Sequence, residues 1–146
     1  MIPEPTELSP QALASIQPRL QRAVALHQAG QLAEAEPLYR DILAQHPGHL
    51  PALQMLGVLS FMAGRQDEGL ALLQRVVEAA PMQAEAHNNL GNALRESGQA
   101  EAAVQCFERA IALQPGFVGA HYNLGNALAV LQRHEAAVAA YDRCLA

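Results

Sequence analysis

Lysine and tryptophan are absent from this 146-residue chain, and cysteine and aromatic residues are scarce. Without lysine, Schiff-base chemistry and the lysine of a phosphate-binding P-loop are excluded. Two cysteines, Cys106 and Cys144, do not make the disulfide framework of a small secreted domain, and they favour a cytoplasmic protein. Aromatic residues make up 4% of the chain, and the 51% hydrophobic fraction comes mainly from Ala, Leu and Val, which favours close-packed helices over a β-sandwich.

Long hydrophobic runs and an excess of positive charge are also missing. No apolar run approaches the roughly 18 to 20 residues of a membrane-spanning helix, so we expect no membrane partner. The start, MIPEPTEL, lacks the basic end and the apolar stretch of a signal peptide. The net charge is −5, which argues against a nucleic-acid partner held by phosphate contacts.

The sequence does contain an internal repeat with a period of 34 residues. The segment AEAHNNLGNAL, which begins at Ala84, returns as VGAHYNLGNAL at Val118, and eight of the eleven positions are identical. The same period places two earlier frames toward the N-terminus. The frames are 16–49, 50–83, 84–117 and a shortened 118–146.

Residues 1–15 precede the frames as an N-terminal extension. Its prolines, Pro3, Pro5 and Pro10, predict little regular structure, although Ser9 and Pro10 can cap a short helix. We therefore expect this extension to be partly disordered or to form a short helix.

Each frame predicts two helices joined by a tight turn. Gly30, Gly64 and Gly98 stand between the halves, where glycine adopts a positive φ at least cost, whereas the fourth frame has Gln132 and predicts a different turn. A proline that cannot continue a helix ends each full frame. Two slots for small residues, one in each half, let the paired backbones approach closely. The prolines are Pro47, Pro81 and Pro115; the slots hold Ala23, Gly57, Gly91 and Gly125, then Ala35, Gly69, Ala103 and Ala137.

This pattern resembles the tetratricopeptide repeat over residues 16–146. The resemblance implies an all-α fold, a right-handed α-solenoid of about four helix-turn-helix repeats, the fourth truncated or uncapped. Pro18 is expected to open the first helix, and Pro37 to lie near the first turn of the second. The aromatic residue that is common early in the first helix of such repeats is replaced here by Arg19, Leu53, His87 and His121.

The resemblance also implies that the first helix of each repeat lines a concave groove. Asn89 and Asn123 share one slot of that helix, and Asn92 and Asn126 share another. Because a carboxamide has two donors and two acceptor lone pairs, these residues suit the backbone of an extended peptide. The alternative is that they bond the neighbouring helix and hold the repeats together, and both roles are compatible. The predicted polar contacts are Asn88, Asn89, Asn92, Tyr122, Asn123 and Asn126.

An apolar set occupies the corresponding helix of the second repeat. Met55, Val58, Phe61 and Met62 either contact a ligand or are covered by residues 1–15. Methionine adapts to many shapes, so it suits a permissive binding surface. Gln21 of the first repeat completes the predicted peptide-binding residues.

Residues for catalysis or metal binding are not found. His46 and His49 flank a Pro-Gly turn, with no cysteine or carboxylate at zinc-ligand spacing. His87 and His121 recur in one slot and are expected to be packing residues. The glycines follow the repeat rather than a phosphate-binding loop, and no serine has a histidine and carboxylate partner. We predict no catalytic residue, no metal and no cofactor, so this segment is not an enzyme.

Two functions remain open. The first is a scaffold that binds a peptide or a partner domain in the groove. The second follows from segments 88–98 and 123–128, which are similar to repeats of O-linked N-acetylglucosamine transferases, where a ladder of asparagines holds the substrate peptide. Residues 32–83 also resemble the N-terminal repeats of bacterial proteins of that class. This resemblance implies a substrate-recruiting N-terminal arm of a larger glycosyltransferase. Asn89 and Asn123 occupy the matching slot, but Gln21 and Met55 replace asparagine in the first two repeats.

The last helix raises a further expectation. Small and apolar residues there are expected to face no partner within the chain, whereas a solenoid normally ends in a polar cap. This predicts self-association through the last helix, or a native continuation beyond it. The residues concerned are Ala137, Ala140, Tyr141 and Cys144.

Overall fold

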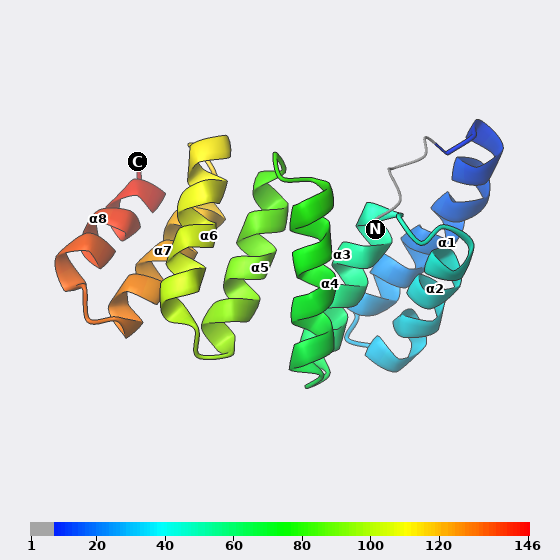
Figure 1. Cartoon of the computed structure of the whole chain (residues 1–146), viewed down its shortest axis with the longest axis horizontal. Helices are drawn as coiled ribbons and strands as arrows, with labels where there is room; N and C mark the ends of the chain where they lie inside the picture. Colours follow the sequence, from blue (N-terminus) through cyan, green and yellow to red (C-terminus); the bar gives the residue numbers. More distant parts are fainter. Residues whose placement is uncertain (1–7) are drawn as a thin grey trace. The chain divides into compact units, whose positions relative to one another are not determined.

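The computed structural model describes residues 8–146, and within them it contains eight α-helices and no strand (Figure 1). The predicted all-α fold class is therefore confirmed. None of the helices in this range is long and apolar enough to cross a membrane. The chain divides into two compact units, one ending at Ala79 and one spanning Ala80–Ala146. The helices are α1 (Pro10–Gln28), α2 (Leu32–Gln45), α3 (Leu50–Met62), α4 (Gln66–Ala79), α5 (Ala84–Glu96), α6 (Ala100–Leu113), α7 (Val118–Val130) and α8 (His134–Cys144).

Helix α1 starts earlier than the repeat frame indicates. Ser9 caps it, because the Ser9 hydroxyl accepts a hydrogen bond from the Ala12 amide at 3.2 Å, and Pro10 occupies the first turn. The helix continues through Pro18, so the prediction that Pro18 opens it is wrong. Residues 10–15 belong to this helix, whereas the expectations for residues 1–7 lie outside the described residues.

Helix α2 also contains a proline beyond its first turn. It starts at Leu32, so Pro37 is an interior residue, contrary to the expected place near the first turn. Proline lacks the backbone N–H that would bond to the residue four positions earlier. The packing of α2 holds the helix together across this missing bond, because Ala35, Tyr39 and Ile42 on its inner face are fully buried.

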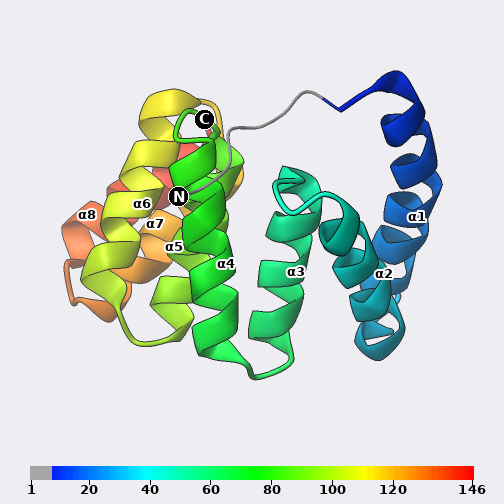
Figure 2. The same ribbon diagram turned by 45° about the vertical axis from the view of Figure 1, so that its right-hand side comes forward.

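The first unit combines a largely aliphatic core, which includes Tyr39, with a network of ion pairs. Figure 2 shows α2 beside α1 and α4 beside α3. On the surface, the Arg40 guanidinium reaches Glu36 and Glu68, both at 2.7 Å, and so joins α2 to α4. Arg65 contacts the same two carboxylates at 2.9 and 3.1 Å. The hydrogen bonds from Arg40 lower the pKa of both glutamates below the ordinary value.

The second unit shows why its small-residue slots need glycine. A Cβ atom at Gly91 would lie 2.6 Å from the Phe107 ring, and one at Gly125 would lie 2.6 Å from Cδ1 of Tyr141. Aromatic rings from α6 and α8 thus rest directly on the backbones of α5 and α7. The predicted close approach of paired helices is confirmed at both positions.

The turns between paired helices all use a left-handed residue. Gly30, Gly64 and Gly98 have φ values of 79°, 87° and 86°. Gln132 has a φ of 60°, so the prediction of a different fourth turn is wrong. The backbone keeps the turn, and a side chain with a Cβ is held in a conformation that costs roughly 1–2 kcal/mol.

Helix α8 packs in a way that corrects an expectation about its exposed face. Ala137 and Ala140 are buried, and Tyr141 is partly buried against α7, so these residues do face a partner within the chain. The small side chains lie inward because they let α8 approach α7. The large apolar residues of this last segment that are exposed are Val138, 57% exposed, and Leu145, 87% exposed.

Candidate functional site

Polar side chains of α5 and α7 meet within the second unit. The Asn123 amide donates a hydrogen bond to the Asn88 side-chain oxygen at 3.0 Å, which links the first helices of two successive repeats. Asn88 is buried and Asn123 is half-buried. Asn92 follows Asn88 by one helical turn, and Asn126 follows Tyr122 in the same way, so each pair shares a face of its helix.

Tyr141, which was not among the predicted binding residues, contacts the predicted residues of α7. The Tyr141 hydroxyl of α8 donates to the Asn126 side-chain oxygen at 2.6 Å. The ring centroid of Tyr141 lies 6.0 Å from that of Tyr122, which is 55% exposed. Tyr141 belongs to a second helix, and the prediction drew only on first helices. The available signal was that its slot in the 34-residue period holds a large residue in every repeat: Tyr39, Leu73, Phe107 and Tyr141.

The hydrogen bonds divide the predicted asparagines into two groups. Asn88, Asn123 and Asn126 bond to side chains of the protein, as the structural alternative requires. The side chains of Asn89 and Asn92 are half-buried, and neither has a hydrogen-bond partner among residues 8–146. A carboxamide has four hydrogen-bonding positions. Even the bonded asparagines therefore keep donors or acceptors for a ligand.

The apolar part of the predicted site lies in the first unit. Met62 is 60% exposed, whereas Met55, Val58 and Phe61 are half-buried, and Met55 packs against the core of its own unit. The apolar and asparagine sets thus belong to different units, and a continuous groove that contains both stays a prediction. Gln21 is exposed on α1. Cover by residues 1–15 is the alternative prediction for this apolar set, and the part of that segment described by the structure begins at Leu8. The Leu8 side chain packs against the core of the first unit.

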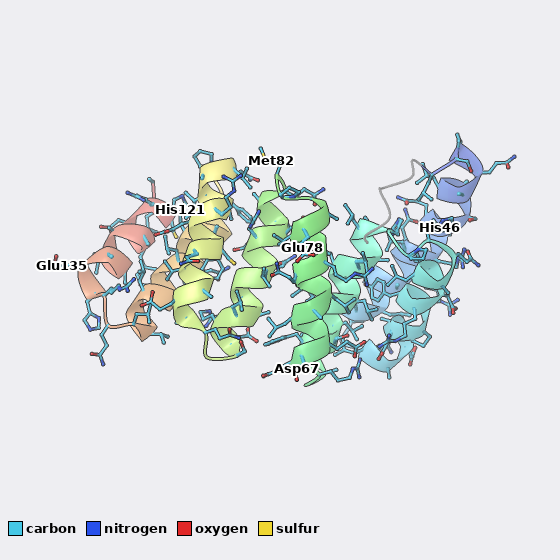
Figure 3. The ribbon with its side chains drawn as sticks, viewed as in Figure 1. His46, Asp67, Glu78, Met82, His121 and Glu135 are labelled. Carbon is cyan, nitrogen blue, oxygen red and sulfur yellow. The ribbon has the colours of Figure 1, made fainter. Side chains whose placement is uncertain are left out.

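Two histidines in equivalent slots have a structural role. His87 and His121 are buried, and Nε2 of each lies 2.8 Å from the carbonyl oxygen of Pro81 or Pro115, respectively. A carbonyl oxygen only accepts, so Nε2 carries the proton in both rings. The prediction that these are packing residues is confirmed, with a hydrogen bond added. Figure 3 labels His121 on α7.

Burial shifts the pKa of a further histidine, in the first unit, and of a thiol in the second. In the first unit, Nδ1 of His27 lies 3.4 Å from the Tyr39 hydroxyl, and burial lowers the pKa of His27. Burial raises the pKa of the Cys106 thiol, which disfavours the reactive thiolate. Within the described part of the chain, no group of three or more His, Cys, Asp or Glu residues is placed to hold a metal ion.

Comparison with known protein families identifies the repeat. A model described as "Tetratricopeptide repeat" matches residues 26–92, and a second, described as "TPR repeat", matches residues 91–132. The chain belongs to the tetratricopeptide-repeat (TPR) family. TPR domains are scaffolds for protein–protein interaction, and this general function follows from the fold. No curated protein sequence matches the chain.

Solved TPR structures resemble the chain over most of its length. MamA from Desulfovibrio magneticus RS-1 is 25% identical with a TM-score of 0.80, and the match covers 89% of this chain and 73% of that one. Another MamA crystal structure, 21% identical, has a TM-score of 0.78 over 92% and 81% of the two chains. A mutant O-GlcNAc transferase from Thermobaculum terrenum is 31% identical with a TM-score of 0.78, but the match covers 83% of this chain and 23% of the transferase.

Proposed function

We propose that the second unit binds an extended peptide through the asparagines of α5 and α7. The proposal rests on one observation: the half-buried side-chain amides of Asn89 and Asn92 have no hydrogen-bond partner among residues 8–146. On binding, such an amide exchanges a hydrogen bond with water for one with the ligand, and this exchange contributes about 0.5–1.5 kcal/mol. A peptide backbone presents both an N–H and a C=O at each residue, which matches a carboxamide.

Neighbouring groups give this surface a defined shape. The Asn123–Asn88 bond fixes two amides in place, and Tyr141 fixes the Asn126 side chain, so these groups lose little freedom when a peptide binds. The exposed ring of Tyr122 offers an apolar surface beside them. The expected ligand is a peptide recognised chiefly by its backbone, with Tyr122 packing against one of its side chains.

The test selects peptides from a random library against the whole chain and measures their Kd for single variants. Asn89→Ala and Asn92→Ala are each expected to weaken binding by about fivefold, the effect of losing one hydrogen bond. Gln105→Ala, which truncates an exposed amide on α6, is the matched control and should leave the Kd unchanged. N-methylation of the bound peptide's backbone should weaken binding by a similar factor. Selected peptides that bind both asparagine variants as tightly as the native chain would overturn the proposal.

A second candidate function is the substrate-recruiting arm of a larger glycosyltransferase. The observation that favours it is the 31% identity to the Thermobaculum terrenum O-GlcNAc transferase, over 23% of that protein's length. The native mass tests it, by immunoblotting of cell extract with an antibody against this segment. A band several times larger than 15.6 kDa would support the arm, and a band near 15.6 kDa would contradict it.

Self-association and a cytoplasmic location remain predictions. The residues first expected to drive self-association are largely buried, so any such contact would depend on Val138 and Leu145. Sedimentation velocity at increasing concentration tests it. A concentration-dependent dimer that Val138→Glu abolishes would support self-association, and a monomer at the highest concentration would contradict it.

A further inference from the structure

The first unit contains a pocket whose lining includes none of the predicted contact residues. It has a volume of about 320 Å³ and lies between α2, α3 and α4. Leu53 and Leu56 of α3, which are 3% and 2% exposed, form its floor together with Leu72 of α4. Two exposed arginines, Arg40 and Arg75, stand at its edge. The pocket therefore combines an aliphatic floor with a positively charged rim.

Comparison between repeats shows how the lining of the pocket differs from the equivalent positions of the second unit. Leu53 occupies the slot that holds His87 and His121 in the third and fourth repeats. The ring of His121 donates to the carbonyl of Pro115, and Pro47, which lines the pocket, is the equivalent proline. Leucine has no polar atom with which to make that bond. Where the fourth repeat carries an imidazole bound to the proline loop, the second repeat carries aliphatic surface.

The two arginines differ in their ionic partners. Arg40 donates to both Glu36 and Glu68 at 2.7 Å, so its charge is largely balanced. Arg75 has no ion pair with any residue between 8 and 146. Glu78, labelled in Figure 3, lies on the same helix and accepts instead from Gln74 at 3.3 Å. With no carboxylate partner in that range, the Arg75 guanidinium is available to an anion beside the aliphatic floor.

We propose that this pocket binds a partner peptide in which a leucine-like side chain stands next to a carboxylate. The aliphatic group enters between Leu53, Leu56 and Leu72, and the carboxylate pairs with Arg75. Ligand pockets begin at about 300 Å³, so this volume holds one or two side chains rather than a large cofactor. A peptide is the expected source because TPR domains bind proteins. The site is in the first unit, so its failure would leave the asparagine surface of the second unit untouched.

The experiment titrates the whole chain with acetyl-Leu-Asp-amide and follows the leucine methyl signals by NMR. The methyls of Leu53, Leu56 and Leu72 are expected to shift together and saturate, with a Kd on the order of millimolar for so small a probe. The neutral acetyl-Leu-Asn-amide should bind at least threefold more weakly. Equal binding of the two probes, or no local shift at about 20 mM probe, would overturn the proposal.

Two matched variants test the charge. Arg75→Gln is expected to weaken binding of acetyl-Leu-Asp-amide at least threefold. Arg109→Gln changes the residue in the same slot one repeat later and should leave binding unchanged. Equal losses in the two variants would show that only net charge matters, which would overturn the assignment to Arg75. Both arginines are exposed, so neither variant should disturb folding.

A third variant tests the shape. Leu53→His recreates the residue of the later repeats, and its ring should donate to the Pro47 carbonyl and close the pocket. We expect the probe-induced shifts to disappear while the helical circular dichroism is retained. Undiminished binding to a folded Leu53→His chain would contradict the proposal. If this variant does not fold, the comparison of Arg75→Gln with Arg109→Gln tests the proposal instead. Tighter binding of octanoate than of the dipeptide would assign the pocket to a free aliphatic acid and overturn the peptide as occupant.

Discussion

Gly125→Ala in α7 is expected to destabilise the second unit, although the repeat pattern alone predicts that alanine is tolerated. The equivalent slot in the first repeat holds Ala23, which is fully buried. In the fourth repeat, a Cβ at Gly125 would lie 2.6 Å from Cδ1 and 2.8 Å from Cζ of Tyr141, and it would also collide with Cε1. Carbon atoms attract best at roughly 3.5–4.0 Å, so the ring would have to retreat by about 1 Å.

The magnitude follows from three effects. Forcing a methyl group into a packed site costs about 1–3 kcal/mol. Movement of the ring also breaks the 2.6 Å hydrogen bond from Tyr141 to Asn126, which contributes about 1 kcal/mol. The higher helix propensity of alanine offsets about 1 kcal/mol. The expected net loss in the free energy of unfolding is therefore about 1–3 kcal/mol.

The assay is urea unfolding followed by circular dichroism, with hydrogen exchange of the α7 and α8 amides to place the effect in the second unit. Gly119→Ala is the matched control on the same helix, because a Cβ there contacts only the Phe117 ring, at 3.4 Å or more. It should stabilise the protein by about 0.5 kcal/mol. In a Tyr141→Ala background, Gly125→Ala should no longer destabilise. A Gly125→Ala protein at least as stable as the native chain would refute this reasoning.

Three further predictions concern pH and backbone strain. Burial lowers the pKa values of His27 and His49 below 6.5, and hydrogen bonds from Arg40 lower those of Glu36 and Glu68 below 4.5. The unfolded chain therefore takes up protons first, and stability falls with acidification, first below pH 6.5 and again below pH 4.5. His27→Gln should reduce the first step in a plot of urea midpoint against pH, and His27→Gln combined with His49→Gln should remove it. Burial raises the pKa of Tyr39 from 10.0 to about 12. The stability that the neutral Tyr39 side chain contributes is therefore present below pH 10 and is lost as the pH rises toward 12. Tyr39→Phe should remove this alkaline loss of stability, and an alkaline profile that the substitution leaves unchanged would contradict the prediction. Gln132→Gly should raise stability by about 0.5–1 kcal/mol in thermal unfolding because it relieves the positive φ, and no gain would show that the strain is small.

Much of the helical fold was predictable because the residues that each turn and each close helix contact require recur in successive repeats. A glycine recurs after the first helix of three repeats, at Gly30, Gly64 and Gly98, and predicts the positions of the turns. The positive φ values of these glycines confirm that glycine is used there for its left-handed backbone conformation. The errors came where one repeat departs from the others. Gln132 shows that the turn persists without its glycine, because the flanking helices impose the backbone. Pro18 misled because proline marks a helix start only when nothing before it supplies a cap, and Ser9 does.

The site was less predictable because sequence spacing places a residue on a helix face but not its bonding partner. The shared slots of Asn89 with Asn123 and of Asn92 with Asn126 predicted equivalent roles. In the structure Asn123 bonds to Asn88, whereas Asn89 has no partner among residues 8–146. The difference depends on which side chains neighbouring helices present, and a period of 34 residues does not encode that.

The repeats also act as internal controls, which makes their departures informative. Where two repeats share a residue, as at His87 and His121, the structure repeats the same 2.8 Å bond to a proline carbonyl, so the common role is structural. Two repeats carry other residues in this slot, Arg19 and Leu53, and a leucine has no polar atom with which to bond the Pro47 carbonyl. A slot whose residue differs between repeats and borders a pocket is therefore a stronger functional signal than a slot whose residue recurs with the same hydrogen bond. That criterion selects Leu53 over the recurrent histidines.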